Sequence, residues 1–80
     1  MMYMEKRYLR FQAWSAPVLQ LNSEKIDCII DIKKIIHAQR AHNTITIQTT
    51  QDVINYHFDV EAQAKQVYNK IWEMLIQQEG

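Results

Sequence analysis

The strongest constraint on the fold comes from the C-terminal half of the chain, residues 43–78. The run Thr44 to Thr50 alternates β-branched apolar residues with polar ones, and a second alternating run extends from Val53 to Asp59. Alternation with a period of two is typical of strands that bury one face. The residues that follow have helical spacing up to Gln78. Two adjacent strands and one amphipathic helix do not cover each other, so we expect the rest of the chain to supply further strands.

The predicted helix is defined by a continuous apolar stripe. Its members recur at helical spacing and are Ala64, Val67, Tyr68, Ile71, Met74 and Leu75. Asp59 is the expected N-cap, and Glu61 falls in the first turn, where a carboxylate interacts favourably with the helix dipole. Trp72 and Ile76 flank the stripe and widen it beyond what one small sheet face has to cover. We expect the stripe itself to pack on the sheet.

The N-terminal part of the chain contains two candidate strands. Tyr8 to Trp14 alternates, with Leu9, Phe11 and Ala13 on one side and Tyr8, Arg10 and Gln12 on the other. A short helix is the alternative for this segment, because it is rich in helix-forming residues. After a break at Ser15-Ala16-Pro17, the run Val18 to Leu21 is predicted to be a short second strand.

The isoleucine-rich stretch after it is harder to assign. β-branched side chains lose rotamer freedom in helices and suit a pleated surface, so we predict that Asp27 to Ala38 is extended, with a bend or bulge near Lys33-Lys34. One face of this strand would hold Cys28, Ile30, Ile32, Lys34, Ile36 and Ala38. A helix over Lys25 to Gln39 remains the alternative, and it would change the topology.

Turns have to form almost without glycine. The single glycine is the last residue, so the Asn-Gly and Asp-Gly hairpin turns are excluded. We expect hairpin turns at Arg40 to Asn43 and at Gln51-Asp52, because Asn and Asp tolerate left-handed or Asx-turn geometry. The inward faces of the strands on either side of the second turn would then be Ile45, Ile47 and Thr49, and Ile54, Tyr56 and Phe58.

Together these elements predict an α+β fold, with residues 1–80 as a single domain. An antiparallel sheet of four or five strands would carry the C-terminal helix on one face. Several short strands, the last ending in Tyr56-His57-Phe58, precede one amphipathic helix, and this order is similar to that of small pleckstrin-homology-like domains. The resemblance covers Val18 to Gln78. It implies a half barrel that binds peptides or lipid headgroups and has no catalytic activity.

Residue types that carry catalysis are sparse. Cys28 lies in an apolar run, where a free cysteine usually packs as a small hydrophobic residue. His37, His42 and His57 could converge around one hairpin, but their spacing matches no zinc motif, and no glycine-rich phosphate loop is present. We therefore expect a protein that is not an enzyme and that has no metal, cofactor or small-molecule substrate.

The expected location is the cytoplasm. No apolar run approaches the roughly 20 residues that span a bilayer, and the N-terminus lacks the apolar core of a signal peptide. The single cysteine excludes an intramolecular disulfide and suits a reducing compartment. No membrane partner is expected.

Two functions are compatible with the sequence. The first is a small protein–protein interaction module that binds another protein or itself as a homodimer, because aromatic residues and methionine are enriched at interfaces. Its expected partner-binding residues are Tyr8, Arg10, Trp14, Trp72 and Ile76.

The alternative is a weak binder of single-stranded nucleic acid. In the N-terminal strand Lys6, Arg7 and Arg10 are interleaved with Tyr3, Tyr8, Phe11 and Trp14. The formal net charge of zero argues against this function. The two hypotheses differ in salt dependence, since nucleic-acid binding weakens steeply as the salt concentration rises.

Overall fold

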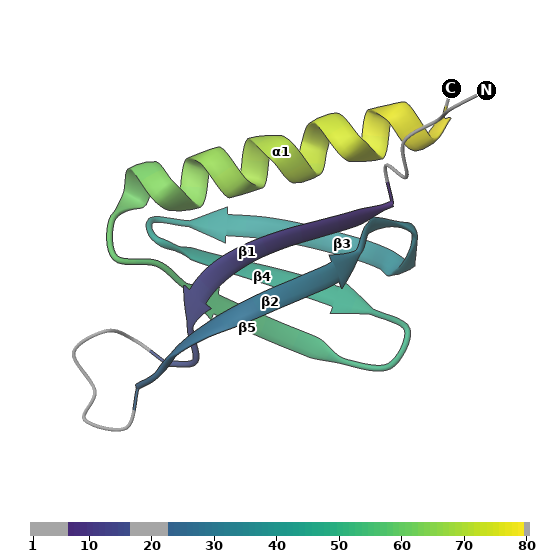
Figure 1. Ribbon diagram of the computed structural model, residues 1–80. Helices are drawn as coiled ribbons and strands as arrows, with labels where there is room; N and C mark the ends of the chain where they lie inside the picture. Colours follow the sequence, from purple (N-terminus) through teal and green to yellow (C-terminus); the bar gives the residue numbers. More distant parts are fainter. Residues whose placement is uncertain (1–6, 17–22, 80) are drawn as a thin grey trace.

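The computed structural model describes residues 7–16 and 23–79, which form one five-stranded antiparallel sheet and one long helix (Figure 1). The elements in chain order are β1 (Tyr8–Trp14), β2 (Lys25–Asp31), the 3-10 turn η1 (Ile32–Lys34), β3 (Ile35–Ala41), β4 (Thr44–Thr49), β5 (Val53–His57) and α1 (Glu61–Glu79). The strand order is β2-β1-β5-β4-β3, so β2 and β3 are the two edges. The predicted α+β class is confirmed.

Strand β1 has the predicted bounds and faces. Leu9, Phe11 and Ala13 pack into the core, whereas Tyr8 and Arg10 are exposed on the opposite side. β1 pairs with β2 from Tyr8↔Asp31 to Trp14↔Lys25. The strand predicted for Val18 to Leu21 lies outside the described residues.

The isoleucine-rich stretch is extended, as predicted, but it forms two strands. Between them the chain makes the 3-10 turn η1, which begins after Asp31 and is capped by the Asp31 carboxylate accepting the Lys33 backbone N–H at 3.1 Å. A register shift against β4 follows between Ile35 and His37. The expected bend near Lys33-Lys34 is therefore this turn.

The turn also changes which side chains point inward. Cys28, Ile30 and Ile32 are buried, as expected for one strand face. Ile36 was assigned to the same face and is 59% exposed. That assignment is wrong, because η1 and the register shift interrupt the two-residue alternation.

Both predicted hairpins form at their predicted places. In the first, His42 and not the neighbouring asparagine adopts the left-handed conformation, with φ 57°. Asn43 instead ties the hairpin to the chain after β5: its Nδ2 donates to the Phe58 carbonyl at 2.7 Å, and its own carbonyl accepts the Phe58 N–H at 2.8 Å. In the second hairpin, the Thr49 hydroxyl accepts the backbone N–H of Asp52 at 3.1 Å.

The apolar stripe of α1 packs on the concave face of the sheet. Ala64, Ile71 and Met74 are buried, and the other members of the predicted stripe, Val67, Tyr68 and Leu75, are half-buried against the core. The buried core of the described residues comprises Ala13, Cys28, Ile30, Ile32, Ile45, Ile47, Tyr56, Phe58, Ala64, Ile71 and Met74. Most of the predicted inward faces are thus confirmed.

Two predictions are wrong: Asp59 is not the N-cap of α1, and Ile54 is not buried with the inward face of β5. The Val60 carbonyl accepts the N–H of Gln63 at 3.2 Å, so Val60 occupies the N-cap position. The Asp59 carboxylate instead accepts a hydrogen bond from the Trp14 indole N–H. Ile54 is 42% exposed, because it lines the rim of a hollow between β2 and the β4–β5 hairpin.

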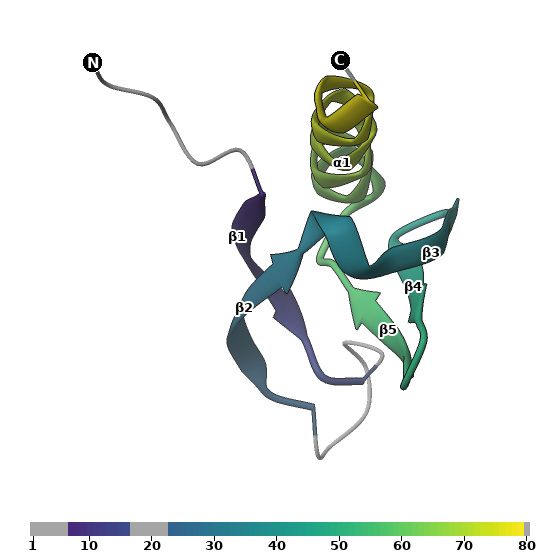
Figure 2. The ribbon, with the colours of Figure 1, turned by 90° about the vertical axis from the view of Figure 1, so that its right-hand side faces the viewer.

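The sheet is strongly bent where β1 meets β5. These strands are paired at Trp14↔His57, at one end, and the rest of β1 diverges from β5. The β1–β2 hairpin and the β3–β4–β5 meander therefore form two wings, which η1 bridges, and α1 lies across them (Figure 2). This arrangement places α1 beside the edge strand β3.

Candidate interaction groove

A groove of about 220 Å³ separates the edge strand β3 from α1. It is lined by Ile35, Ile36, His37, Ala38, Tyr68, Ile71, Trp72 and Leu75. We call this surface the β3–α1 groove. Apart from the imidazole of His37, the hydroxyl of Tyr68 and the indole N–H of Trp72, its side chains are apolar. Such a lining suits apolar side chains of a partner.

Helical spacing explains the α1 wall of the groove. Ile71 and Trp72 lie three and four residues after Tyr68, and Leu75 lies four and three residues after them, so all four share one side of the helix. Ile71 is 1% exposed and forms part of the core, whereas Trp72 is 61% exposed. The Tyr68 hydroxyl donates to the Ala38 carbonyl at 3.5 Å and links the two walls. The helix therefore places the exposed Trp72 indole next to the buried apolar side chain of Ile71.

The β3 wall contributes a second exposed apolar side chain. Ile36 lies within the register shift and points away from the core, with 59% of its surface exposed. Ile76, one turn after Trp72 on α1, is 49% exposed. Single exposed hydrophobic residues are ordinary, but a cluster of them beside a groove marks an interaction site.

Strand β3 is also an edge without the usual protection. Edge strands carry backbone N–H and C=O groups that can pair with another strand, and charged residues, proline or a covering loop commonly block them. The other edge, β2, carries Lys25, Asp27 and Asp31. β3 contains no lysine, proline or acidic residue. It does have the bulge at its start, but the rest of the strand is suited to strand addition.

Polar contacts fix both ends of β3. At its C-terminal end, the Arg40 guanidinium donates to the Glu61 carboxylate at 3.1 Å and to the His42 carbonyl at 2.8 Å. Because of this ion pair, the one cation in β3 is held toward α1 and does not protect the edge. The hairpin after β3 is thereby attached to the start of α1.

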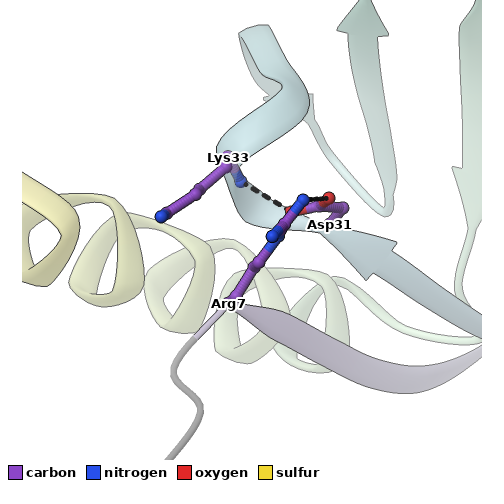
Figure 3. A network of polar contacts seen from close by, with 3 residues as sticks. All are labelled: Arg7, Asp31 and Lys33. Atoms are coloured by element: carbon purple, nitrogen blue, oxygen red, sulfur yellow. Dashed lines mark hydrogen bonds and ion pairs between the residues drawn. The ribbon is translucent and has the colours of Figure 1, made fainter.

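At the N-terminal end, η1 is anchored by a bidentate ion pair (Figure 3). The Arg7 guanidinium donates to the two Asp31 carboxylate oxygens at 2.9 and 2.7 Å. This hydrogen bonding to Arg7 lowers the pKa of Asp31, and the bond from the Lys33 N–H adds to the effect. The groove is therefore a largely preformed surface.

The five sequence-predicted binding residues do not form one site. Trp72 lines the groove, and Ile76 lies one turn further along α1 without lining it. Tyr8, Arg10 and Trp14 lie on β1, and β5 and β4 separate that strand from β3. Trp14 is half-buried, and its indole N–H is engaged by Asp59.

Sequence reasoning missed the β3 side of the groove. Ile36 was assigned to the core, and neither the edge position of β3 nor the role of Tyr68 as a groove residue was foreseen. The absence of lysine, proline and acidic residues from β3 was the available signal, because such residues commonly protect an edge strand. The strand order needed to use that signal is a long-range property.

The aromatic residues of β1 do not form a stacking surface. The Phe11 ring faces inward, 5.1 Å from the ring centre of Tyr56 and 5.9 Å from that of Phe58. Tyr8 is exposed, and the Arg7 guanidinium lies 5.4 Å from its ring centre. Lys6 and Tyr3 lie outside the described residues.

The cysteine and two of the histidines considered above as candidate chemical groups are buried or lie beside polar neighbours. Cys28 is buried, as predicted, and burial, with a smaller contribution from Asp27, raises the pKa of its thiol. His57 Nδ1 lies 3.2 Å from the Thr44 hydroxyl, and His37 Nε2 lies 3.1 Å from the Gln39 amide oxygen. Within residues 7–16 and 23–79, no three His, Cys, Asp or Glu side chains are grouped so that they could hold a metal ion.

Comparisons with known proteins gave no match: no protein-family model, no curated protein and no solved structure is similar to the chain. Among residues 7–16 and 23–79, no helix combines the length and the apolar character needed to cross a membrane. The assignment of the candidate site therefore rests on its geometry alone.

Proposed function

We propose that this protein is a non-catalytic protein–protein interaction module that binds an extended segment of a partner in the β3–α1 groove. The observation that carries the proposal is the coincidence of the unprotected edge β3 with the exposed side chains of Ile36 and Trp72. Backbone groups of an edge strand supply affinity for any extended segment, and adjoining pockets select its side chains. The free, buried Cys28 supports action in a reducing compartment such as the cytoplasm.

Trp72 is the expected energetic centre of the interface. Its exposed 61% corresponds to about 100–150 Å² if a whole indole buries about 150–250 Å². Covering that area is worth about 2–4 kcal/mol before the costs of association. Tryptophan is also among the residues most enriched at interface hot spots. Trp72→Ala should therefore weaken partner binding by about 10- to 100-fold.

The proposal can be tested with peptides selected from a displayed random octapeptide library. A selected peptide would be synthesised, its affinity measured by fluorescence anisotropy, and its site mapped by amide hydrogen exchange. We expect the bound peptide to protect β3 amides that exchange freely in the unbound protein, because these N–H groups would donate hydrogen bonds to carbonyls of the new strand.

Two isoleucines provide a matched comparison. Ile36 and Ile29 lie on the two opposite edge strands and are 59% and 68% exposed. Ile36→Ala should weaken peptide binding, whereas Ile29→Ala should not. Protection of β2 in place of β3, or equal losses in both variants, would refute the proposed site.

The alternative function, weak binding of single-stranded nucleic acid, has support from Tyr8 and Arg10 alone, which are exposed on the outer face of β1. An oligonucleotide titration at low and high salt tests it. Binding that falls steeply with salt and is lost in Arg10→Glu would favour this function over the interaction module.

A further inference from the structure

We propose that the segment bound in the β3–α1 groove is acidic: an extended peptide with apolar side chains and a carboxylate at the end that lies beside η1. This inference rests on the proposed function and specifies the chemistry of the partner. It follows from the charges around the groove, which are unequal although the chain as a whole has no net charge.

Two exposed lysines border the groove. Lys33 lies on η1, directly before β3, whereas its neighbour Lys34 lines the separate hollow between β2 and the β4–β5 hairpin. Lys65 is exposed on α1 seven residues before Trp72, a spacing that places the two residues on the same side of the helix. The groove therefore has cations at one end and along its helical wall.

Neither Lys33 nor Lys65 forms an ion pair within the described part of the chain. The ion pairs found there join Arg7 to Asp31 and Arg40 to Glu61. Figure 3 shows the Lys33 side chain extending away from Asp31, which holds only the backbone N–H of that residue. Both acidic residues nearest the ends of the groove are thus already occupied by arginines.

The position of Glu73 supports the same conclusion. Glu73 follows Trp72 directly, and successive residues of an α-helix are turned by about 100°. The residues that line the groove, Tyr68, Ile71 and Leu75, lie on the other side of Trp72. Glu73 is therefore turned away from the groove and leaves the charges of the lysines available to a partner.

The experiment uses the displayed octapeptide library and the full chain. We expect selected peptides to be enriched in Asp or Glu together with apolar residues. For the strongest peptide, the double variant Lys33→Glu/Lys65→Glu should lose roughly tenfold in affinity, because exposed charges at an interface rim have modest individual effects. A peptide with Glu→Gln should lose affinity for the wild-type protein, but not for the double variant.

Lys70→Glu is the matched control. Lys70 is exposed on the same helix two residues before Trp72, which turns it about 200° around the axis and away from the groove. This variant makes the same change of charge per residue and should alter the affinity by less than about twofold.

The outcomes separate this inference from the proposed function. If selected peptides are neutral or basic, or if the lysine double variant binds normally while Trp72→Ala does not, the acidic partner is refuted and the interaction module stands. If Trp72→Ala and Ile36→Ala also bind normally, both proposals fail. If the library gives no binder and the protein sediments as a dimer that Trp72→Ala dissociates, the occupant is a second copy and the acidic partner is refuted.

Discussion

Two isoleucines of α1 allow a direct test of how the helix stabilises the fold. Ile71 is 1% exposed, and Ile76, on the same helix, is 49% exposed. Replacing Ile71 by alanine removes three carbon atoms from the core, which costs about 2.4 kcal/mol of transfer free energy at about 0.8 kcal/mol per group. The unfilled cavity adds to this, so the free energy of unfolding should fall by about 3–4 kcal/mol.

The same substitution at Ile76 should have a much smaller effect. About half of the side chain is already in water, and alanine has a higher helix propensity than isoleucine, so a loss below about 1 kcal/mol is expected. A chain of 80 residues has a free energy of unfolding of about 4–12 kcal/mol. Ile71→Ala therefore removes a large share of the total stability.

Urea unfolding followed by circular dichroism measures both variants. The midpoint for Ile71→Ala should fall far below that of the wild type, with an unchanged dependence on urea, and the midpoint for Ile76→Ala should stay close to it. Equal losses in the two variants, or a loss below about 1 kcal/mol for Ile71→Ala, would show that α1 does not pack on the sheet through this face.

Three further substitutions or measurements test individual contacts. Trp14→Phe keeps an aromatic ring but removes the N–H that bonds to Asp59, and it should lower the free energy of unfolding by about 0.5–1 kcal/mol in urea titrations; unchanged stability would mean that this bond contributes nothing. Because the ion pair with Arg7 lowers the pKa of Asp31, the ionised carboxylate stabilises the fold above its ordinary pKa of about 3.9, and this contribution disappears as the pH falls through the lowered value. Asp31→Asn should therefore destabilise the protein at a pH of about 7 and have little effect at a pH of about 2, and equal effects in urea titrations at both would contradict the lowered pKa. The Cys28 thiol, buried and with a raised pKa, should react slowly with a disulfide reagent in the folded protein and rapidly in urea; equal rates would show that the thiol is accessible.

The predictable part of the fold is the part set by neighbouring residues. The faces of β1 and the stripe of α1 follow directly from the spacing of apolar side chains, because the period of a strand or helix is a local property. The same reasoning failed at Ile36. There the short turn η1 and a register shift changed the phase of the side chains, and residue types alone do not reveal such an interruption.

The candidate site was predictable only in part. Trp72 and Ile76 were recognised as surplus apolar surface, because they lie outside the stripe that a helix needs for packing. Trp14 was grouped with them, although its indole N–H is used by Asp59, forty-five residues later in the chain. Contacts of that kind depend on tertiary structure, since the partner cannot be identified from local spacing.

The sequence by itself thus predicted the strands β1, β4 and β5 and the helix α1, most of their inward faces and the burial of Cys28. Only the tertiary structure decided that β1 pairs with β5, that β3 is left as an edge, and that α1 lies beside it. The physical reason is that side-chain periodicity specifies which face of an element is buried, whereas the pairing of distant strands specifies which backbone groups remain free. The β3–α1 groove is a product of that pairing.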